Sequence, residues 1–164
     1  MNRKLLTLIA LIICGTGLYL WWFSDTKVVT RSTHKLIECF EIDAGDGRIG
    51  GAITTSTFRD LLDDNISPRV ERNDIGYITD LVSFFTKGDL VQLHVGLINS
   101  AATVKITDRN VTITDIEDEK ALVNLSFHII TEKLTKNLDH DININLTYKK
   151  VDGDWKVTEA VLTK

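Results

Sequence analysis

Hydrophobic residues follow three successive patterns along this 164-residue chain. The first is an apolar run from Leu5 to Phe23 that contains no charged side chain. Up to Gly88, apolar residues then recur at intervals of three and four, and beyond it they alternate with polar ones. Spacing of three and four residues is typical of helices, whereas alternation is typical of strands that bury one face. The sequence therefore predicts helices first and a sheet afterwards.

The apolar run is typical of a membrane anchor. As a helix, residues 5–23 would extend roughly 28 Å, close to the roughly 30 Å hydrocarbon core of a bilayer. Arg3 and Lys4 favour a cytoplasmic N-terminus, and the run ends in aromatic residues suited to the far interface: Tyr19, Trp21, Trp22 and Phe23. We expect a cytoplasmic tail and transmembrane anchor over 1–23, a linker over 24–32 and a domain over 33–164. A bacterial inner membrane with the domain in the periplasm is the expected location.

A cleaved signal peptide is the alternative interpretation of this run. The run is longer than the roughly 7 to 15 apolar residues of a signal peptide, and WWFSDTK follows it where a cleavage site would have small residues. Cys14 lacks the small preceding residue that lipid attachment requires. We therefore favour the uncleaved anchor.

Three segments with helical spacing are predicted after the anchor: 33–42, 52–65 and 73–87. Alternation then predicts strands beginning at Val91 and at Val104, and two clearer ones over 121–130 and 141–150. Asp152-Gly153 predicts a tight turn into the last strand. The fold class is α+β, with three helices packed on a strongly curved antiparallel sheet.

The last two alternating segments have an apolar and a polar face. The expected inner face consists of Val123, Leu125, Phe127, Ile129, Ile142, Ile144, Leu146 and Tyr148. The expected outer face consists of Asn124, Ser126, His128, Asn143, Asn145, Thr147 and Lys149. His94 is in phase with Gln92 on the polar side of its expected strand, so a surface position is predicted for it.

The order of elements, the loop around Gly45-Asp46 and the final Asp-Gly-Asp-Trp hairpin resemble the nuclear transport factor 2-like superfamily, also called cystatin-like, over roughly residues 30–162. The resemblance implies a cone of curved sheet wrapped around helices. Ketosteroid isomerases, SnoaL-like dehydratases, transport factors and secretion-system parts share this fold, so it says little about chemistry. In the enzymes, an inward Asp or His acts as base beside a Tyr or a protonated acid.

Charge and residue types exclude several functions. The formal net charge is −4, and an acidic domain disfavours nucleic acid and anionic lipid as partners. No histidine pair has metal-site spacing, and the DAGDGR loop lacks the distal Glu of a calcium loop, so neither metal nor cofactor is expected. Cys39 is the one cysteine outside the anchor, so no disulfide within the domain is expected.

The expected inner face is hydrocarbon apart from one hydroxyl. It predicts an apolar ligand pocket formed by Phe127, Ile144, Leu146 and Tyr148, with no catalytic residue. We therefore predict a membrane-anchored, non-enzymatic module that binds other membrane proteins or a small apolar ligand. The alternatives are an isomerase or dehydratase using Tyr148 with Asp80 or Asp115, and a periplasmic subunit of a secretion or conjugation assembly. A homodimer would form through the outer face, at Asn124, Ser126, His128, Asn143, Asn145 and Thr147.

Overall fold

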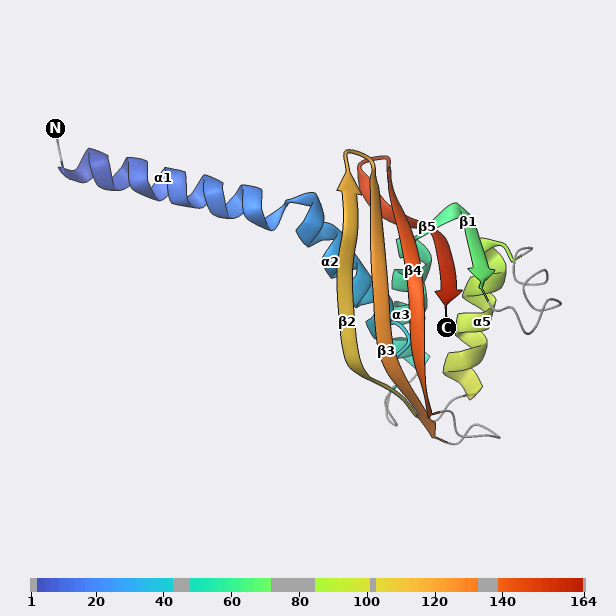
Figure 1. The fold of residues 1–164 in the computed structure, drawn as a ribbon. Coiled ribbons are helices and arrows are strands. Elements are labelled where there is room, and N and C mark those ends of the chain that lie inside the picture. Colours follow the sequence, from blue (N-terminus) through green and yellow to red (C-terminus); the bar gives the residue numbers. More distant parts are fainter. Residues whose placement is uncertain (1–2, 43–47, 72–84, 101–102, 133–138, 164) are drawn as a thin grey trace.

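The computed structural model describes residues 3–42, 48–71, 85–100, 103–132 and 139–163. Within these ranges, four helices precede or flank the sheet: α1 (Arg3–Trp22), α2 (Asp25–Glu38), α3 (Arg48–Leu61) and α5 (Lys87–Ser100). Five strands form it: β1 (Leu62–Val70), β2 (Thr103–Glu117), β3 (Lys120–Glu132), β4 (Asp139–Val151) and β5 (Asp154–Thr163). Figure 1 shows α1 projecting away from the remaining elements.

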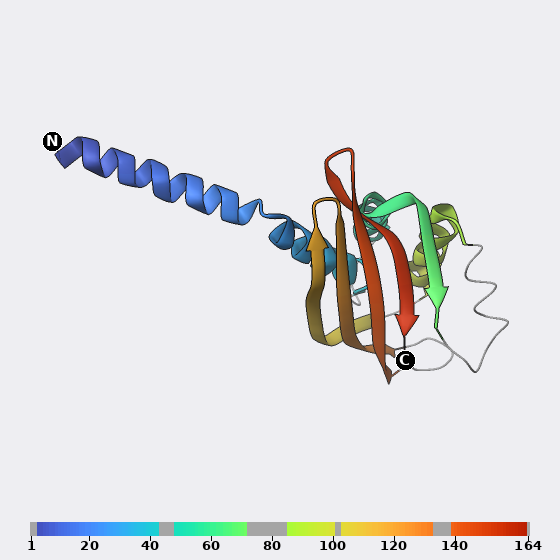
Figure 2. The same cartoon turned by 45° about the horizontal axis from the view of Figure 1, so that its top comes forward.

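The sheet has the strand order β1-β5-β4-β3-β2. β2 to β5 are antiparallel, whereas β1 pairs in parallel with β5. The strands curve, and α2, α3 and α5 lie on one side of them (Figures 1 and 2). The α+β class and the helices on one face are confirmed, and the sheet is mixed rather than wholly antiparallel.

Helix α2 begins earlier than predicted, at Asp25, so most of the expected linker at 24–32 is helical. Its buried residues are Val29, Thr33, Leu36 and Ile37, which share one helical face. Burial of that face against the sheet holds the helix together over its whole length, including the first turns, where polar residues predominate.

The predicted helix at 52–65 is right only in part, because α3 ends at Leu61 and β1 begins at Leu62. Pro68 lies buried within β1, opposite Ala160. A proline is tolerated there because β1 is an edge strand, and an edge strand has backbone groups without a ladder partner. Most of the predicted helix at 73–87 lies outside the described residues.

The strand predicted to begin at Val91 is wrong, because these residues belong to α5. Val91 and His94 are buried while Leu93 is 55 % exposed, which is helical spacing and not alternation. A five-residue apolar pattern is too short to separate the two periods, and packing of α5 against α3 decides between them.

The two faces of β3 and β4 are as predicted. Val123, Leu125, Leu146 and Tyr148 are at most 3 % exposed and form the core with residues of the helices. The predicted β4–β5 turn is also confirmed, since Asp152 and Gly153 have φ of 53° and 89°, as a two-residue hairpin turn requires.

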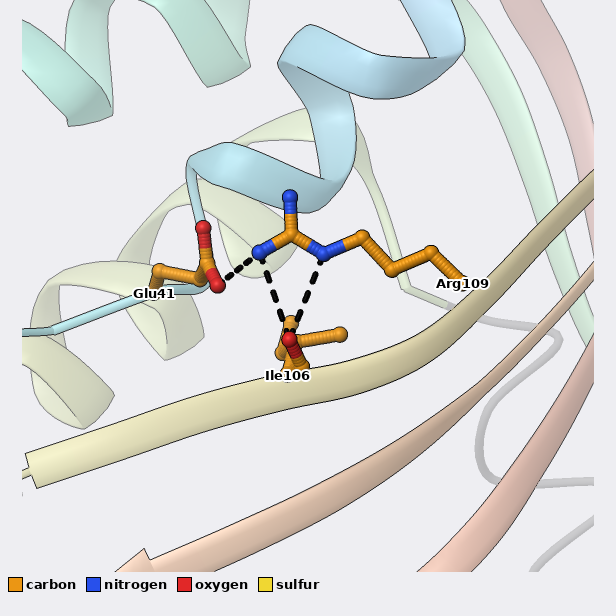
Figure 3. Close-up of polar contacts among 3 residues, drawn as sticks. All are labelled: Glu41, Ile106 and Arg109. Atoms are coloured by element: carbon orange, nitrogen blue, oxygen red, sulfur yellow. Dashed lines mark hydrogen bonds and ion pairs between the residues drawn. The ribbon is translucent and has the colours of Figure 1, made fainter.

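A bulge in β2 joins the sheet to the segment after α2. Asp108 has φ of 51°, and the pairing of β2 with β3 shifts at this point. Arg109 donates from Nε and Nη2 to the carbonyl oxygen of Ile106, at 3.3 Å each, and Nη2 also pairs with Glu41 (Figure 3). The contact holds the end of α2 beside the edge of the sheet.

Among the residues that the structure describes, no helix is both long and apolar enough to cross a membrane, so the predicted spanning anchor is not supported by the structure.

Candidate functional site

A cavity of about 320 Å³ lies where β1, β4 and β5 meet at one end of the sheet. Val70 pairs with Leu162, and Leu162 pairs with Ile144, so these side chains share the inner face. The lining residues are Val70, Glu71, His140, Asp141, Ile142, Leu162 and Thr163. The walls are mainly apolar, and charged and polar groups surround them.

Burial along β4 explains why the cavity opens at this end. The inward residues alternate from Tyr148 back to His140. Tyr148 and Leu146 are buried, Ile144 and Ile142 are half-buried, and His140 is exposed. Counting only the described residues, this face of the sheet is therefore covered toward the β4–β5 turn and open toward the start of β4.

His94 occupies the packed interior between the helices. It is 2 % exposed, with Nε2 2.7 Å from the carbonyl oxygen of Cys39 and Nδ1 3.2 Å from Oγ1 of Thr55. Its ring stacks on Phe58 at 4.6 Å between centroids. A carbonyl only accepts, so Nε2 carries the proton and Nδ1 accepts from the threonine. Burial lowers the pKa of His94, which keeps it neutral.

The prediction of a surface His94 is therefore wrong. Both ring nitrogens have partners, and the ring links α5 to α3 and to the end of α2, so its role is structural. The helical spacing of Val91 and His94 was the sequence signal that could have located it.

Comparison with known proteins rests on structure, since no protein-family model and no curated protein matches the sequence. An NTF2-like protein from Cytophaga hutchinsonii superposes with a TM-score of 0.60 at 17 % identity, over 86 % of this chain and 98 % of that one. A candidate scytalone dehydratase from Novosphingobium aromaticivorans superposes with a TM-score of 0.60 at 13 % identity, over 84 % of this chain and 82 % of that one. A candidate dehydratase of the NTF2-like family from Streptomyces avermitilis superposes with a TM-score of 0.58 at 13 % identity, over 85 % of this chain and 94 % of that one.

The domain has the NTF2-like fold. Identities this low show the fold and leave the chemistry open, so the expected resemblance is confirmed at the level of architecture. In this NTF2-like sheet, the apolar cavity at the open end is the candidate site.

The predicted pocket residues lie deeper in the NTF2-like domain than the cavity. The Tyr148 hydroxyl is 3.0 Å from Oγ1 of Thr33, which donates its own proton to the carbonyl oxygen of Val29 at 2.9 Å. Tyr148 is therefore the donor to Thr33, and burial raises its pKa. Neither it nor Phe127, Ile144 or Leu146 lines the cavity.

Of the two acids proposed to act with Tyr148, the structure describes only Asp115, and it does not place Asp115 in the core beside that hydroxyl. Asp115 is exposed on β2, and Asp80 lies outside the described residues. The hydroxyl bonded to Thr33 instead fixes α2 on the sheet. Among the described residues, the Tyr148 hydroxyl is paired with Thr33 and with no acid.

His128 lies on the outer face, as predicted. Its Nδ1 is 2.9 Å from Asp141 and its Nε2 is 3.0 Å from Asp139. Hydrogen bonding to Asp141 raises the pKa of His128, with the nearby carboxylates adding to the effect. The ring pairs two exposed carboxylates at the start of β4, beside the cavity.

The outer face of β3 and β4 is polar, and its residues oppose each other in pairs. Asn124 lies opposite Asn145, and Ser126 opposite Asn143. Thr147 donates to Glu159 of β5 at 3.4 Å. The predicted dimer contact at this face stays a prediction.

Metal-binding groups do not gather within the described ranges: no three His, Cys, Asp or Glu residues there could hold an ion. Cys39 is buried, and desolvation raises the pKa of its thiol to about 11. A protonated, buried thiol is a small apolar group and not a nucleophile.

Proposed function

We propose that this protein is a membrane-attached NTF2-like domain that binds a small ligand at the open end of its sheet without transforming it. The cavity there carries the proposal. Val70, Ile142 and Leu162 provide apolar walls, while Glu71 and His140 provide polar groups at the rim. Pockets of a few hundred Å³ with mainly apolar walls and few polar groups are typical of small-molecule sites.

The lining defines the class of ligand. A volume of about 320 Å³ admits a compact molecule. The apolar walls favour a hydrocarbon body, since removal of apolar surface from water drives its binding. Around these walls, Glu71 and Asp141 add carboxylates and His140 adds an imidazole, which can hydrogen-bond a single polar head group. We therefore expect a compact amphiphile with a neutral or cationic head.

Cavity filling tests this binding, with N-phenyl-1-naphthylamine as a neutral apolar fluorescent probe and the full chain in lipid nanodiscs. Leu162→Trp should fill the cavity and abolish saturable binding above that of empty nanodiscs. Val161→Trp is the matched control, because Val161 faces outward opposite Asn145 and should bind as the wild type does. Saturable binding that survives Leu162→Trp would refute the cavity as the site.

Membrane attachment is supported by the apolar run and by the exposure of α1. The structure describes side chains of the run from Ile12 onward, except Leu18, and the large apolar ones are more than half exposed: Ile12, Ile13, Tyr19, Leu20, Trp21, Trp22 and Phe23. An apolar surface of this extent marks an interaction site. Arg3 and Lys4 favour placing the domain in the periplasm of a bacterium.

Fractionation and labelling test the attachment and its orientation. The full chain should stay with carbonate-washed membranes, and protease added to spheroplasts should remove the domain. A cysteine placed at the exposed β2–β3 turn, as Asp118→Cys, should react with a membrane-impermeant maleimide in intact spheroplasts. Release by carbonate would refute attachment, whereas labelling only after lysis would reverse the orientation.

A dehydratase or isomerase is the second candidate. His140 at the rim could take up or release a proton beside a bound ligand, and two of the similar structures are candidate dehydratases. Turnover of a hydroxylated cyclic substrate that His140→Gln abolishes, while probe binding persists, would favour the enzyme. A subunit role in a secretion or conjugation assembly rests on the layout alone, and co-purification of large membrane partners tests it.

A further inference from the structure

Two cations of α2 lie over the two tryptophans that end α1. Nζ of Lys27 is 4.7 Å from the ring centroid of Trp21, and Cζ of Arg31 is 4.6 Å from that of Trp22. Arg31 also donates from Nη2 to the carbonyl oxygen of Trp22 at 2.9 Å. Both indoles are more than half exposed, so each cation–indole pair faces the surroundings of the protein.

The two cations belong to a basic stripe along α2. Lys27, Arg31 and Lys35 are four residues apart and therefore share one helical face. Within the described part of the chain, none of the three forms an ion pair. Asp25, the acid nearest in sequence to Lys27 and Arg31, is instead hydrogen-bonded to Trp155 and Lys150. A local excess of positive charge thus follows the apolar run of an acidic chain.

We propose that Lys27 and Arg31, with the indoles beneath them, form a binding site for the headgroup of an anionic phospholipid. The inference rests on the proposed membrane attachment and adds the lipid class. Indoles favour the boundary between acyl chains and headgroups. At that depth, the Lys27 ammonium and the remaining Arg31 N–H donors meet the phosphate layer, where each cation is attracted to anionic lipid.

The arrangement favours lipid over other anions. The cations lie where the apolar run ends. A ligand that contacts both the cations and the apolar run presents acyl chains on one side and negative charge on the other. The cation–indole contacts hold the two positive groups at the height of the rings. The overall acidity that disfavours anionic lipid is therefore outweighed locally, at one end of α1.

Tryptophan quenching tests the site with the full chain in vesicles. Vesicles contain phosphatidylcholine and phosphatidylglycerol, and one or the other carries brominated acyl chains. Trp21 and Trp22 should be quenched, while the buried Trp155 contributes a nearly constant background. The wild type should prefer brominated phosphatidylglycerol. Each of Lys27→Gln and Arg31→Gln should reduce that preference about fivefold.

Two controls accompany the measurement. Lys105→Gln removes one exposed positive charge on β2, away from α1, and should leave the preference unchanged. Lys27→Gln alone removes no hydrogen bond among the described residues, so its effect does not depend on the α1–α2 junction, which Arg31 helps to hold. Circular dichroism should show both variants folded.

The possible results distinguish the headgroup site from the membrane attachment on which it rests. Equal quenching by both brominated lipids would refute the headgroup site and leave membrane attachment standing. A preference that survives in Lys27→Gln/Arg31→Gln would refute the assignment to these residues. Quenching by neither lipid would refute attachment itself, and a protein or second copy would then cover α1.

Discussion

The indole N–H of Trp155 donates a hydrogen bond of 2.8 Å to Oδ1 of Asp25, joining the start of α2 to the β4–β5 hairpin. Lys150 donates to the same oxygen at 3.0 Å. The Trp155 hydrogen bond is the main cause that lowers the pKa of Asp25, and the Lys150 hydrogen bond adds to it. These two hydrogen bonds therefore hold the start of α2, the helix that follows α1, against the β4–β5 hairpin.

Asp25→Ala should destabilise the domain by about 1–2 kcal/mol, because it leaves the mostly buried indole N–H of Trp155 without its acceptor. Asp25→Asn should lose less, since an amide oxygen can still accept. Asp154→Ala, at the exposed end of the same hairpin, is the control and should change little. Urea unfolding at neutral pH measures all three, and equal effects of Asp25→Ala and Asp154→Ala would contradict the role of this bond.

Tyr148→Phe should destabilise by about 1 kcal/mol through loss of the hydrogen bond to Thr33. Thr33 keeps its bond to the carbonyl oxygen of Val29, so no buried donor is stranded. Binding of the naphthylamine probe should be unchanged, because Tyr148 does not line the cavity. A double-mutant cycle with Thr33→Val measures the coupling. A stable Tyr148→Phe variant that loses probe binding would move the ligand site into the core.

His94 should make the domain less stable in acid. Its folded-state pKa lies below the ordinary value of 6.5, so the folded state binds fewer protons than the unfolded chain. Its contribution is present above about pH 6.5 and is lost as pH falls below that value. Urea unfolding at pH 8 and pH 5.5 should show a smaller pH-dependent loss in His94→Gln than in the wild type.

His128 should change the pH dependence of stability in the opposite direction to His94 and therefore serves as a control. Its pKa is raised, so its contribution is present below about pH 6.5 and is lost as pH rises through the folded-state value. His128→Gln should therefore enlarge the net loss of stability in acid, whereas His94→Gln reduces it. The same direction of change in both variants would contradict these assignments.

Self-association through the outer face should be weak and concentration-dependent. Asn145→Glu with Ser126→Glu would place like charges in such an interface, yet leave a solvated face almost unaffected. Gln92→Glu with Asn99→Glu adds the same charge to exposed positions of α5 and should sediment as the wild type does. Analytical ultracentrifugation over a range of concentrations decides: a wild type that stays monomeric throughout would refute the dimer.

Local sequence patterns were sufficient to predict an element where one of its faces is buried and the other is exposed to solvent. The alternation in β3 and β4 located Val123 and Tyr148 inside and Asn124 and Asn145 outside, because a strand turns successive side chains to opposite faces. Asp152-Gly153 specified the hairpin, since few residues other than these adopt positive φ without strain. The α+β class followed from the order of these elements, and the NTF2-like fold was expected from a resemblance to that superfamily.

Tertiary packing decided the features that depend on distant partners. Val91 to Val95 is helical because α5 packs on α3, and that packing buries His94 between Phe58 and Thr55. Leu62–Val70 is a strand because β5, some ninety residues later, offers it a parallel edge. The cavity lies beyond Ile144 because the helices that the structure describes cover only part of the sheet. No local sequence pattern indicates where helices packed from elsewhere in the chain stop covering a strand.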